Sequence, residues 1–292
     1  MPSDNETPPV GGLIVPISHS QDVRRRVTSR SALILMYHDV AECPPPATRR
    51  LSVTPRAIEG QLAFLAREGF TGMTFAQLGE AFRTGVELPE RPVVLTFDDG
   101  YAGVAKDAWP LLRNYGLPAT VFVTTGWISD AGRDASGTPL GEMLNWTQIR
   151  TMAAAGIEIG AHSHSHPELD QLDNAALCGE LRHSRAMLED GIGAAVQALA
   201  YPYGYSSARV RLATRAAGYS CAAVVGNVRA THSDDLFMLP RLTISRATDQ
   251  AAFEAIVAGP DGRMLRRERA LTAAWAPVRR ARRAAKWVLN HG

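Results

Sequence analysis

The chain has 292 residues, 46% of them hydrophobic, and a formal net charge of +2 at pH 7. This length and composition predict a globular protein with a sizeable core, and a net charge so close to zero does not mark a nucleic-acid binder. Cys43, Cys178 and Cys221 lie far apart without CxxC spacing, which suggests neither a zinc ribbon nor a full disulfide framework and favours a reducing compartment.

Residues 1–30 are polar, rich in proline and without periodicity, so we expect a disordered N-terminal arm. The apolar run GGLIVPI follows no basic region and is broken by Pro16, which is not the pattern of a signal peptide. No run approaches the ~18 apolar residues that a membrane-spanning helix needs. We therefore expect a soluble, cytoplasmic protein.

From residue 31 onward, short apolar runs alternate with segments of helical length. The apolar runs predict strands at 32–37, 92–99, 118–125, 157–163, 196–204, 219–225 and 237–245. The segments between them predict helices at 54–70, 108–116, 145–156, 174–190 and 207–218. Roughly six to eight strand–helix units in one chain predict an α/β fold with a parallel (β/α) barrel. We expect a single catalytic domain over residues 31–255.

The run VVLTFDDGY places two adjacent carboxylates, Asp98 and Asp99, directly after a predicted strand. The carboxyl ends of strands are where barrels and open α/β sheets place their active sites. An aspartate at a strand end can also simply cap a turn, with Gly100 supplying an unusual backbone conformation. Two carboxylates so close repel each other unless a cation or a shared proton relieves them, which favours a functional site.

A cluster of histidines supplies candidate ligands for such a cation. His162, His164 and His166 alternate in GAHSHSHPEL, and His162 and His166 share a face in either a strand or a helical turn. Two imidazoles, one carboxylate and an open position for water are typical of a catalytic divalent-metal site. Zinc is the first expectation, with cobalt, nickel and iron as alternatives. The competing interpretation is a set of exposed histidines in a polar loop.

The order TFDDG, HSHSH and YPYG resembles the polysaccharide deacetylase family, also called the NodB-homology group or carbohydrate esterase family 4. The resemblance covers about residues 31–250. It implies a distorted (β/α) barrel of the NodB-homology type that removes acetyl groups from sugars at an Asp-His-His metal site. By resemblance, Asp99, His162 and His166 are the metal ligands and Asp98 is the general base. His164 has no role in the pattern, so we expect it to be structural.

Two departures from the family pattern concern the groups that assist the base and the leaving amine. Ala200 stands where many members carry an arginine, and Arg241 in LPRLTIS is the expected replacement, with a surface arginine as the alternative. The late LxH histidine is missing. His38 in LMYHDV resembles the corresponding acid in exopolysaccharide N-deacetylases with permuted motifs, and a buried structural histidine is the alternative.

Three further residues are candidates for contact with the substrate. The resemblance implies that the backbone N–H of Tyr203, in a turn fixed by Pro202, stabilises the oxyanion. Trp146 follows a long loop and is a candidate for stacking on a sugar ring, although a tryptophan at a helix start more often packs on the sheet. The loop before Trp146 is a candidate substrate cover.

The C-terminal residues 256–292 are expected to form a basic helical tail. Residues 263–292 hold nine basic residues and one acidic residue, interspersed with tryptophan and leucine. Such a helix can lie on an anionic membrane surface at the inner face of the membrane, or pack on the remaining chain, which is net acidic. Nucleic acid is not an expected partner, because no recognised module accompanies the charge.

The predicted function is metal-dependent hydrolysis of N-acetyl groups on amino sugars of a polysaccharide or its precursor, in exopolysaccharide biosynthesis. Three alternatives remain: a deformylase or deacetylase of a lipid-linked sugar, an amidohydrolase of a small amide, and a catalytically inactive carbohydrate-binding module. The intact residues Asp98, Asp99, His162 and His166 argue against the inactive module.

Overall fold

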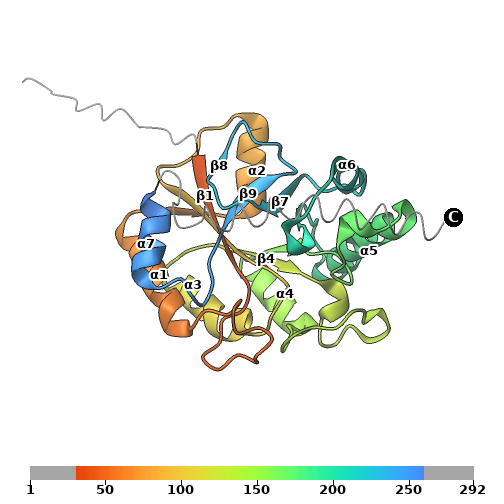
Figure 1. Ribbon diagram of the computed structural model, residues 1–292, viewed down its shortest axis with the longest axis horizontal. Helices are drawn as coiled ribbons and strands as arrows, with labels where there is room; N and C mark the ends of the chain where they lie inside the picture. Colours follow the sequence, from red (N-terminus) through yellow and green to blue (C-terminus); the bar gives the residue numbers. More distant parts are fainter. Residues whose placement is uncertain (1–30, 260–292) are drawn as a thin grey trace, which may run out of the picture.

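The computed structural model describes residues 31–259, and a parallel barrel lies at its centre (Figure 1). The predicted N-terminal arm, and the predicted tail from residue 260, lie outside the described residues. The barrel strands are β1 Ser31–Tyr37, β3 Pro92–Phe97, β4 Thr120–Val123, β5 Glu158–Ala161, β6 Ala198–Ala200, β7 Cys221–Val225 and β9 Leu239–Thr243.

Strand β1 closes the barrel. It pairs in parallel with β3, with Leu33 beside Val93, and with β9, with Leu35 beside Leu242. The remaining pairs follow the order β3, β4, β5, β6, β7 and β9, all parallel. The predicted (β/α) barrel is therefore confirmed, with seven strands in a closed ring.

The predicted helices surround this ring (Figure 1). They are α1 Pro55–Arg67, α3 Trp109–Asn114, α4 Trp146–Ala154, α5 Asn174–Ile192 and α6 Ala208–Ala216. A further helix, α7 Gln250–Ala258, was not predicted from the sequence. Thr54 caps α1 by accepting a hydrogen bond from the backbone N–H of Ala57. Phe253 of α7 packs edge-on against Phe64 of α1, so the expected domain end at residue 255 falls inside a packed helix.

The sequence prediction missed three elements near the amino ends of the strands. These are β2 Thr71–Met73 beside β3, α2 Phe75–Thr84, and β8 Ala230–Thr231, which is antiparallel to β1. The two strands are too short to give an apolar run. Helix α2 does carry a signal, because Thr74 and Gln77 form a capping box at its start.

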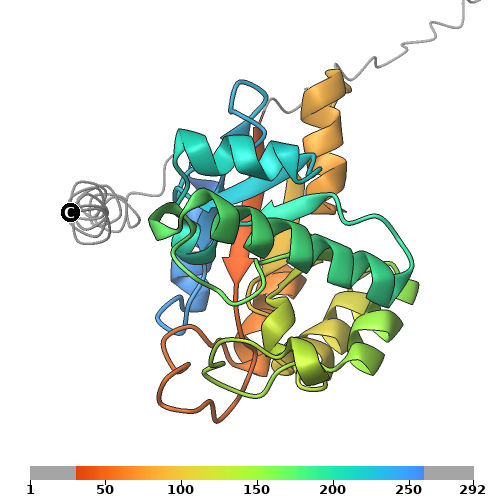
Figure 2. The same ribbon diagram turned by 90° about the vertical axis from the view of Figure 1, so that its right-hand side faces the viewer.

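Helix α2 covers the amino-terminal end of the barrel. Phe75 and Leu78 pack with Ile34, Val94 and Phe122 in a core cluster separate from the main one. In Figure 2 the arrow of β1 points away from α2, towards the loops 38–54 and 124–145 at the opposite end. One end of the barrel is thus covered, and the carboxyl ends of the strands lie at the other. No helix within residues 31–259 is long and apolar enough to cross a membrane.

Candidate active site

A cavity of about 480 Å³ lies at the carboxyl ends of the barrel strands. Its polar wall contains Asp98 and Asp99 after β3, His162 and His166 after β5, and His38 after β1. The remaining wall is largely apolar and includes Met36, Leu51, Trp127, Leu140, Tyr203 and Val225. The barrel therefore brings together acids and histidines that are far apart in the sequence.

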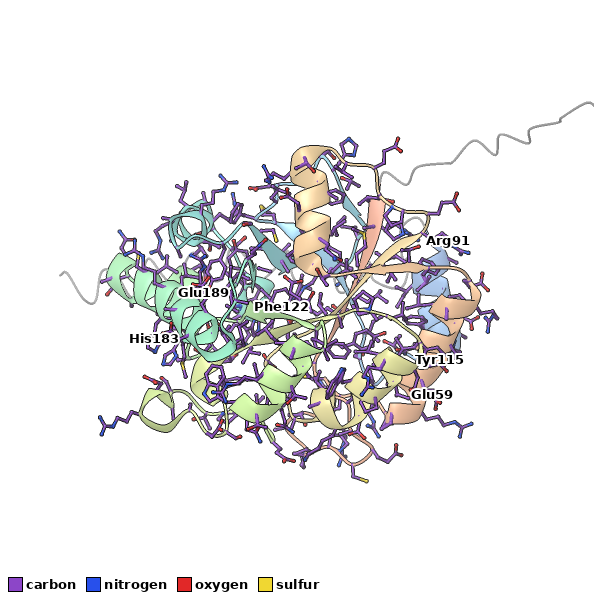
Figure 3. The ribbon with its side chains drawn as sticks, turned by 180° about the vertical axis from the view of Figure 1, so that it is seen from behind. Glu59, Arg91, Tyr115, Phe122, His183 and Glu189 are labelled. Carbon is purple, nitrogen blue, oxygen red and sulfur yellow. The ribbon has the colours of Figure 1, made fainter. Side chains whose placement is uncertain are left out.

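Asp98 forms a buried ion pair with Arg241 of β9. The two guanidinium nitrogens Nη1 and Nη2 donate to Oδ1 and Oδ2 at 2.6 and 2.7 Å. Nη1 also lies 3.1 Å from the hydroxyl of Thr96, and the guanidinium lies over the ring of Phe122, which Figure 3 places at the centre of the molecule. Arg241 therefore takes the place of the arginine that is missing at position 200, and its predicted contact with Asp98 is present.

The environment of Asp98 keeps this carboxyl ionised. Burial by itself would raise its pKa, but the charge of Arg241, followed by His162 and the hydrogen bonds from Arg241, lowers the pKa below its ordinary value. A carboxylate of this kind is deprotonated at neutral pH and can therefore accept a proton.

Asp99, His162 and His166 converge on one point. The Nε2 atoms of both histidines lie 3.3 Å from Oδ1 of Asp99, and the three ligand atoms all lie within 4.8 Å of one another. Oδ1 is buried and makes no hydrogen bond to any described residue. A carboxylate and two imidazoles that meet at an unsatisfied oxygen fit a divalent cation such as zinc.

The tautomer of His162 also suits a metal ligand. Its Nδ1 lies 2.9 Å from the carbonyl oxygen of Ala200. A carbonyl oxygen only accepts, so Nδ1 carries the proton and the lone pair of Nε2 faces Asp99 in the neutral imidazole. An outer hydrogen bond of this kind typically orients a metal-binding histidine.

The charges around the triad shift its pKa values. Burial would raise the pKa of Asp99, but the adjacent side chains of His162 and His166 bring it well below the ordinary value. Burial opposes the charged form of His162, yet Asp98 and Asp99 together raise its pKa. Burial dominates at His166 and lowers its pKa. The triad therefore combines an ionised carboxylate with a His166 imidazole that favours the neutral form.

Several residues of the site have left-handed backbone conformations, which residues other than glycine rarely adopt. Asp99 has φ +73°, Ser163 +63°, His166 +61° and Tyr203 +60°. Each such residue costs on the order of 1 kcal/mol or more, and it persists only where its surroundings fix it. The folding free energy of the barrel thus holds the site in a conformation that the local chain disfavours.

His38 lies in the wall of the same cavity, as the sequence predicts. Its Nδ1 is buried and has no hydrogen-bond partner among residues 31–259. Pro202 is buried in the turn that carries Tyr203, and Tyr203 packs edge-on against the ring of His166 at 4.7 Å. The structure therefore brings His38 and Tyr203 to the triad, whereas Pro202 is buried within the turn and does not line the cavity, so its prediction as a substrate-binding residue is corrected.

The structure does not bring Trp146 to the cavity. Its backbone N–H donates to Asp130, and its indole covers Gly191 of α5 and contacts Arg150. The interpretation of Trp146 as a sugar-stacking residue is corrected, because the side chain packs between α4 and α5 instead.

Trp127 is the tryptophan of the site, and sequence reasoning missed it. It follows β4, lines the cavity, and packs on the ring of His166 with centroids 4.8 Å apart and planes 31° apart. The available signal was its place at the end of the strand after the TFDDG strand. His164 turns away from the cavity, with Nδ1 2.9 Å from the Thr125 hydroxyl, as expected of a structural residue.

Comparisons with known proteins agree with this geometry. The family model for polysaccharide deacetylase matches residues 85–222, a range that holds both aspartates and both histidines of the triad and base. Over these residues, just under half of its length, the chain is similar to the polysaccharide deacetylase family. The description of that family is of a hydrolase that removes acetyl groups from polysaccharides.

Individual relatives cover most of the chain. The putative polysaccharide deacetylase YxkH of Bacillus subtilis (strain 168) is 25% identical over 226 residues, covering 77% of this chain and 75% of that protein. The poly-β-1,6-N-acetyl-D-glucosamine N-deacetylase of Staphylococcus aureus (strain MSSA476) is 23% identical over 252 residues, covering 80% and 83%. The structure of the Streptococcus pyogenes deacetylase PplD in complex with acetate superposes with a TM-score of 0.68 at 24% identity, covering 75% and 94%. That last likeness establishes the shared fold.

Proposed function

We propose that this protein is a divalent-metal-dependent N-deacetylase that hydrolyses N-acetyl groups on amino sugars of a polysaccharide. The observation that carries the proposal is one cavity in which the Arg241-paired Asp98 lies beside the Asp99, His162 and His166 triad. The name of the Staphylococcus aureus relative supports an N-acetylglucosamine polymer as the substrate class.

The triad would hold the cation, with zinc as the first expectation and cobalt, nickel or iron as alternatives. When bound, a divalent ion there supplies Lewis-acid polarisation of the amide carbonyl and lowers the pKa of water. The remaining steps belong to side chains of this chain.

In the proposed mechanism Asp98 is the general base. Water adds its oxygen to the amide carbon while Asp98 accepts a proton, and Arg241 keeps the carboxylate ionised and fixed in orientation. His38, protonated on its ring, then gives a proton to the departing nitrogen as the carbon–nitrogen bond breaks. The backbone N–H of Tyr203 is the candidate donor to the oxyanion. The products are acetate and a free amine on the sugar.

The alternatives receive less support from the described residues. An inactive carbohydrate-binding module has no need for a base held by a bidentate arginine beside a metal triad. A lipid-linked substrate and membrane contact depend on the basic tail, which lies outside the described residues, so both stay predictions.

The direct test measures acetate release from N-acetylglucosamine oligomers by the purified protein. Chelation is expected to abolish release, and zinc or cobalt to restore it. Asp98→Asn is expected to lower kcat by about 10²–10⁴ while leaving metal binding intact, because a positioned general base contributes about that factor. Release that persists without metal, or in Asp98→Asn, would contradict the proposal.

A further inference from the structure

The turn between the two histidine ligands is held from outside on two sides. The carbonyl oxygens of Ser163 and His164 accept from the backbone N–H groups of Thr125 and Gly126, and one side chain of α5 engages the N–H groups of the turn. Oε2 of Glu180 accepts hydrogen bonds from the backbone N–H groups of His164 and Ser165, both at 2.8 Å. Oε1 accepts a third from the hydroxyl of Ser165. A single carboxylate thus engages two successive amides of the segment that links His162 to His166.

This turn has little to hold it within its own sequence. Ser163 and His166 both have left-handed conformations, and a hydrogen bond inside the turn runs from the N–H of His166 to the hydroxyl of Ser163, at 3.1 Å. Successive amides that point the same way form a concave site for an anion, and the Glu180 carboxylate fills it. Bonds from a charged acceptor are stronger than those between neutral groups.

Helix α5 also holds the residue between the ligands. The ring of His164 packs edge-on against His183, one turn along α5 from Glu180, with centroids 4.4 Å apart. His164 is therefore drawn towards the helix, while His162 and His166 face Asp99 on the other side of the turn. Figure 2 shows α5 running across the outside of the molecule, and Figure 3 labels His183 on it.

We propose that Glu180 is a positioning residue for the metal site. By fixing the backbone of the turn, it sets the distance and direction of the His166 imidazole relative to His162 and Asp99, and so determines the affinity for the metal. The inference rests on the metal-dependent function proposed above. Helix α5 thus contributes to metal binding although it lies outside the cavity.

The helix itself does not depend on Glu180. Asp173 caps its start, and Leu177, Leu181 and Leu188 are buried in the main core. Removing the Glu180 carboxylate should therefore loosen the turn without unfolding α5.

The test compares two glutamates of the same helix. Glu180→Ala removes the acceptor for the turn, whereas Glu189→Ala removes an acceptor for the N–H of Val196 and an ion pair with Arg185. Figure 3 shows Glu189 on the outer side of the molecule. Glu180→Gln is the conservative rescue, because its amide oxygen can still accept from both backbone groups.

The readouts are zinc affinity, by competition with a coloured chelator, and the absorption spectrum of the cobalt-loaded protein. Outer-sphere partners of metal ligands typically contribute about 10- to 100-fold in affinity, so Glu180→Ala should bind zinc at least about tenfold more weakly and show an altered cobalt spectrum. Glu180→Gln should recover most of the affinity. Glu189→Ala should lower the melting temperature and keep the zinc affinity and spectrum of the wild type.

Zinc affinity of Glu180→Ala within twofold of the wild type would overturn the proposal. If that variant does not fold, the double variant Glu180→Gln, Ser165→Ala replaces it, with an expected loss of about three- to tenfold and the same criterion. A wild type that binds no zinc would overturn the metal site itself, and this inference with it. If the wild type binds zinc and Glu180→Ala binds it weakly, the metal site and the positioning role of Glu180 are both supported.

Discussion

The ion pair between Asp98 and Arg241 determines when the proposed base is ionised. Both side chains are buried, so neither charge is relieved by water. Without the guanidinium, burial would dominate at Asp98 and raise its pKa. The arginine comes from β9 rather than from the YPYG strand β6, yet it reaches the same carboxylate because β9 and β3 both flank β1 in the closed barrel.

Weakening this pair should move the acid limb of the activity profile. Asp98 acts as a base only when deprotonated, and in the wild type its lowered pKa keeps it so into the acid range. Arg241→Lys keeps a charge but loses the paired hydrogen bonds, and Arg241→Met loses both. The acid limb of kcat/KM against pH should therefore shift to higher pH in Arg241→Lys and further in Arg241→Met.

Arg241→Met should also lower the free energy of unfolding by about 3–5 kcal/mol, since it leaves a buried charge unpaired. Arg246→Lys is the control, because Arg246 is exposed and bonds backbone carbonyls away from the cavity. An acid limb that stays in place in both Arg241 variants would show that Asp98 is not the base.

The two tryptophans should respond differently to the same substitution. Trp127 packs on His166 in the cavity wall, and Trp146 packs between α4 and α5. Aromatic contacts of this kind contribute about 1 kcal/mol, which corresponds to roughly fivefold in a rate constant. We expect Trp127→Phe to lower kcat/KM for oligomer deacetylation about three- to tenfold and Trp146→Phe to leave it within twofold. Equal losses in the two variants would argue against a role for Trp127.

The contrast between these tryptophans shows what the sequence could predict of the site. Asp98, Asp99, His162 and His166 were predictable because they follow predicted strands and lie in the TFDDG and HSHSH motifs that resemble the family pattern. Arg241 was predictable as the partner of Asp98 because the subgroup that the AYPYG motif resembles carries a Pro-Arg pair at this place in the sequence. Trp127 was not, because which of two tryptophans faces the cavity depends on how the loops after β4 fold, and no periodicity in the sequence records that.

At the scale of elements, the placement of α2 depends on a partly buried acid. Glu158, at the start of β5, accepts from the N–H of Ala76 and from the hydroxyl of Thr120, both through Oε2. It thereby fixes the start of the helix that covers the barrel. The long strands and helices were predictable from apolar runs, whereas the placement of α2 depends on this contact between residues 82 positions apart.

Ionisation of Glu158 should cost stability. Burial raises its pKa in the folded protein, although Thr120 and the Ala76 N–H lower it in part. A raised folded pKa means that the stabilising contribution of Glu158 is fully present below its unfolded pKa and is lost as the pH rises through the folded pKa. Glu158→Gln keeps an oxygen that can accept both bonds and carries no charge.

Glu158→Gln should therefore match the wild type in stability at acid pH and exceed it at neutral pH, by about 1.4 kcal/mol for each unit of pKa displacement. Urea unfolding of both proteins across this pH range measures the difference. Glu158→Ala is the control, since it leaves a buried N–H and a hydroxyl unpaired and should lose about 1–3 kcal/mol at every pH. A difference between Glu158→Gln and the wild type that does not change with pH would contradict this account.

At the scale of the whole molecule, the triad links parts of the barrel that only folding brings together. Asp99 follows β3 and the two histidines follow β5, with β4 between them. The unfolded chain cannot present these three ligands at one point. A metal ion should therefore bind the folded state almost exclusively and stabilise the barrel as a whole.

Metal removal should accordingly lower the melting temperature. At a free zinc concentration of 100 times the Kd, binding adds about 2.7 kcal/mol to the free energy of unfolding. For a fold of this size that corresponds to about 5–10 °C. The measurement is thermal unfolding with zinc and with a chelator, for the wild type and for Asp99→Asn. The substitution removes the charged ligand, so the melting temperature of Asp99→Asn should not respond to the chelator. If the melting temperature of the wild type is also the same with zinc and with chelator, then Asp99, His162 and His166 bind no ion and contribute only to the fold.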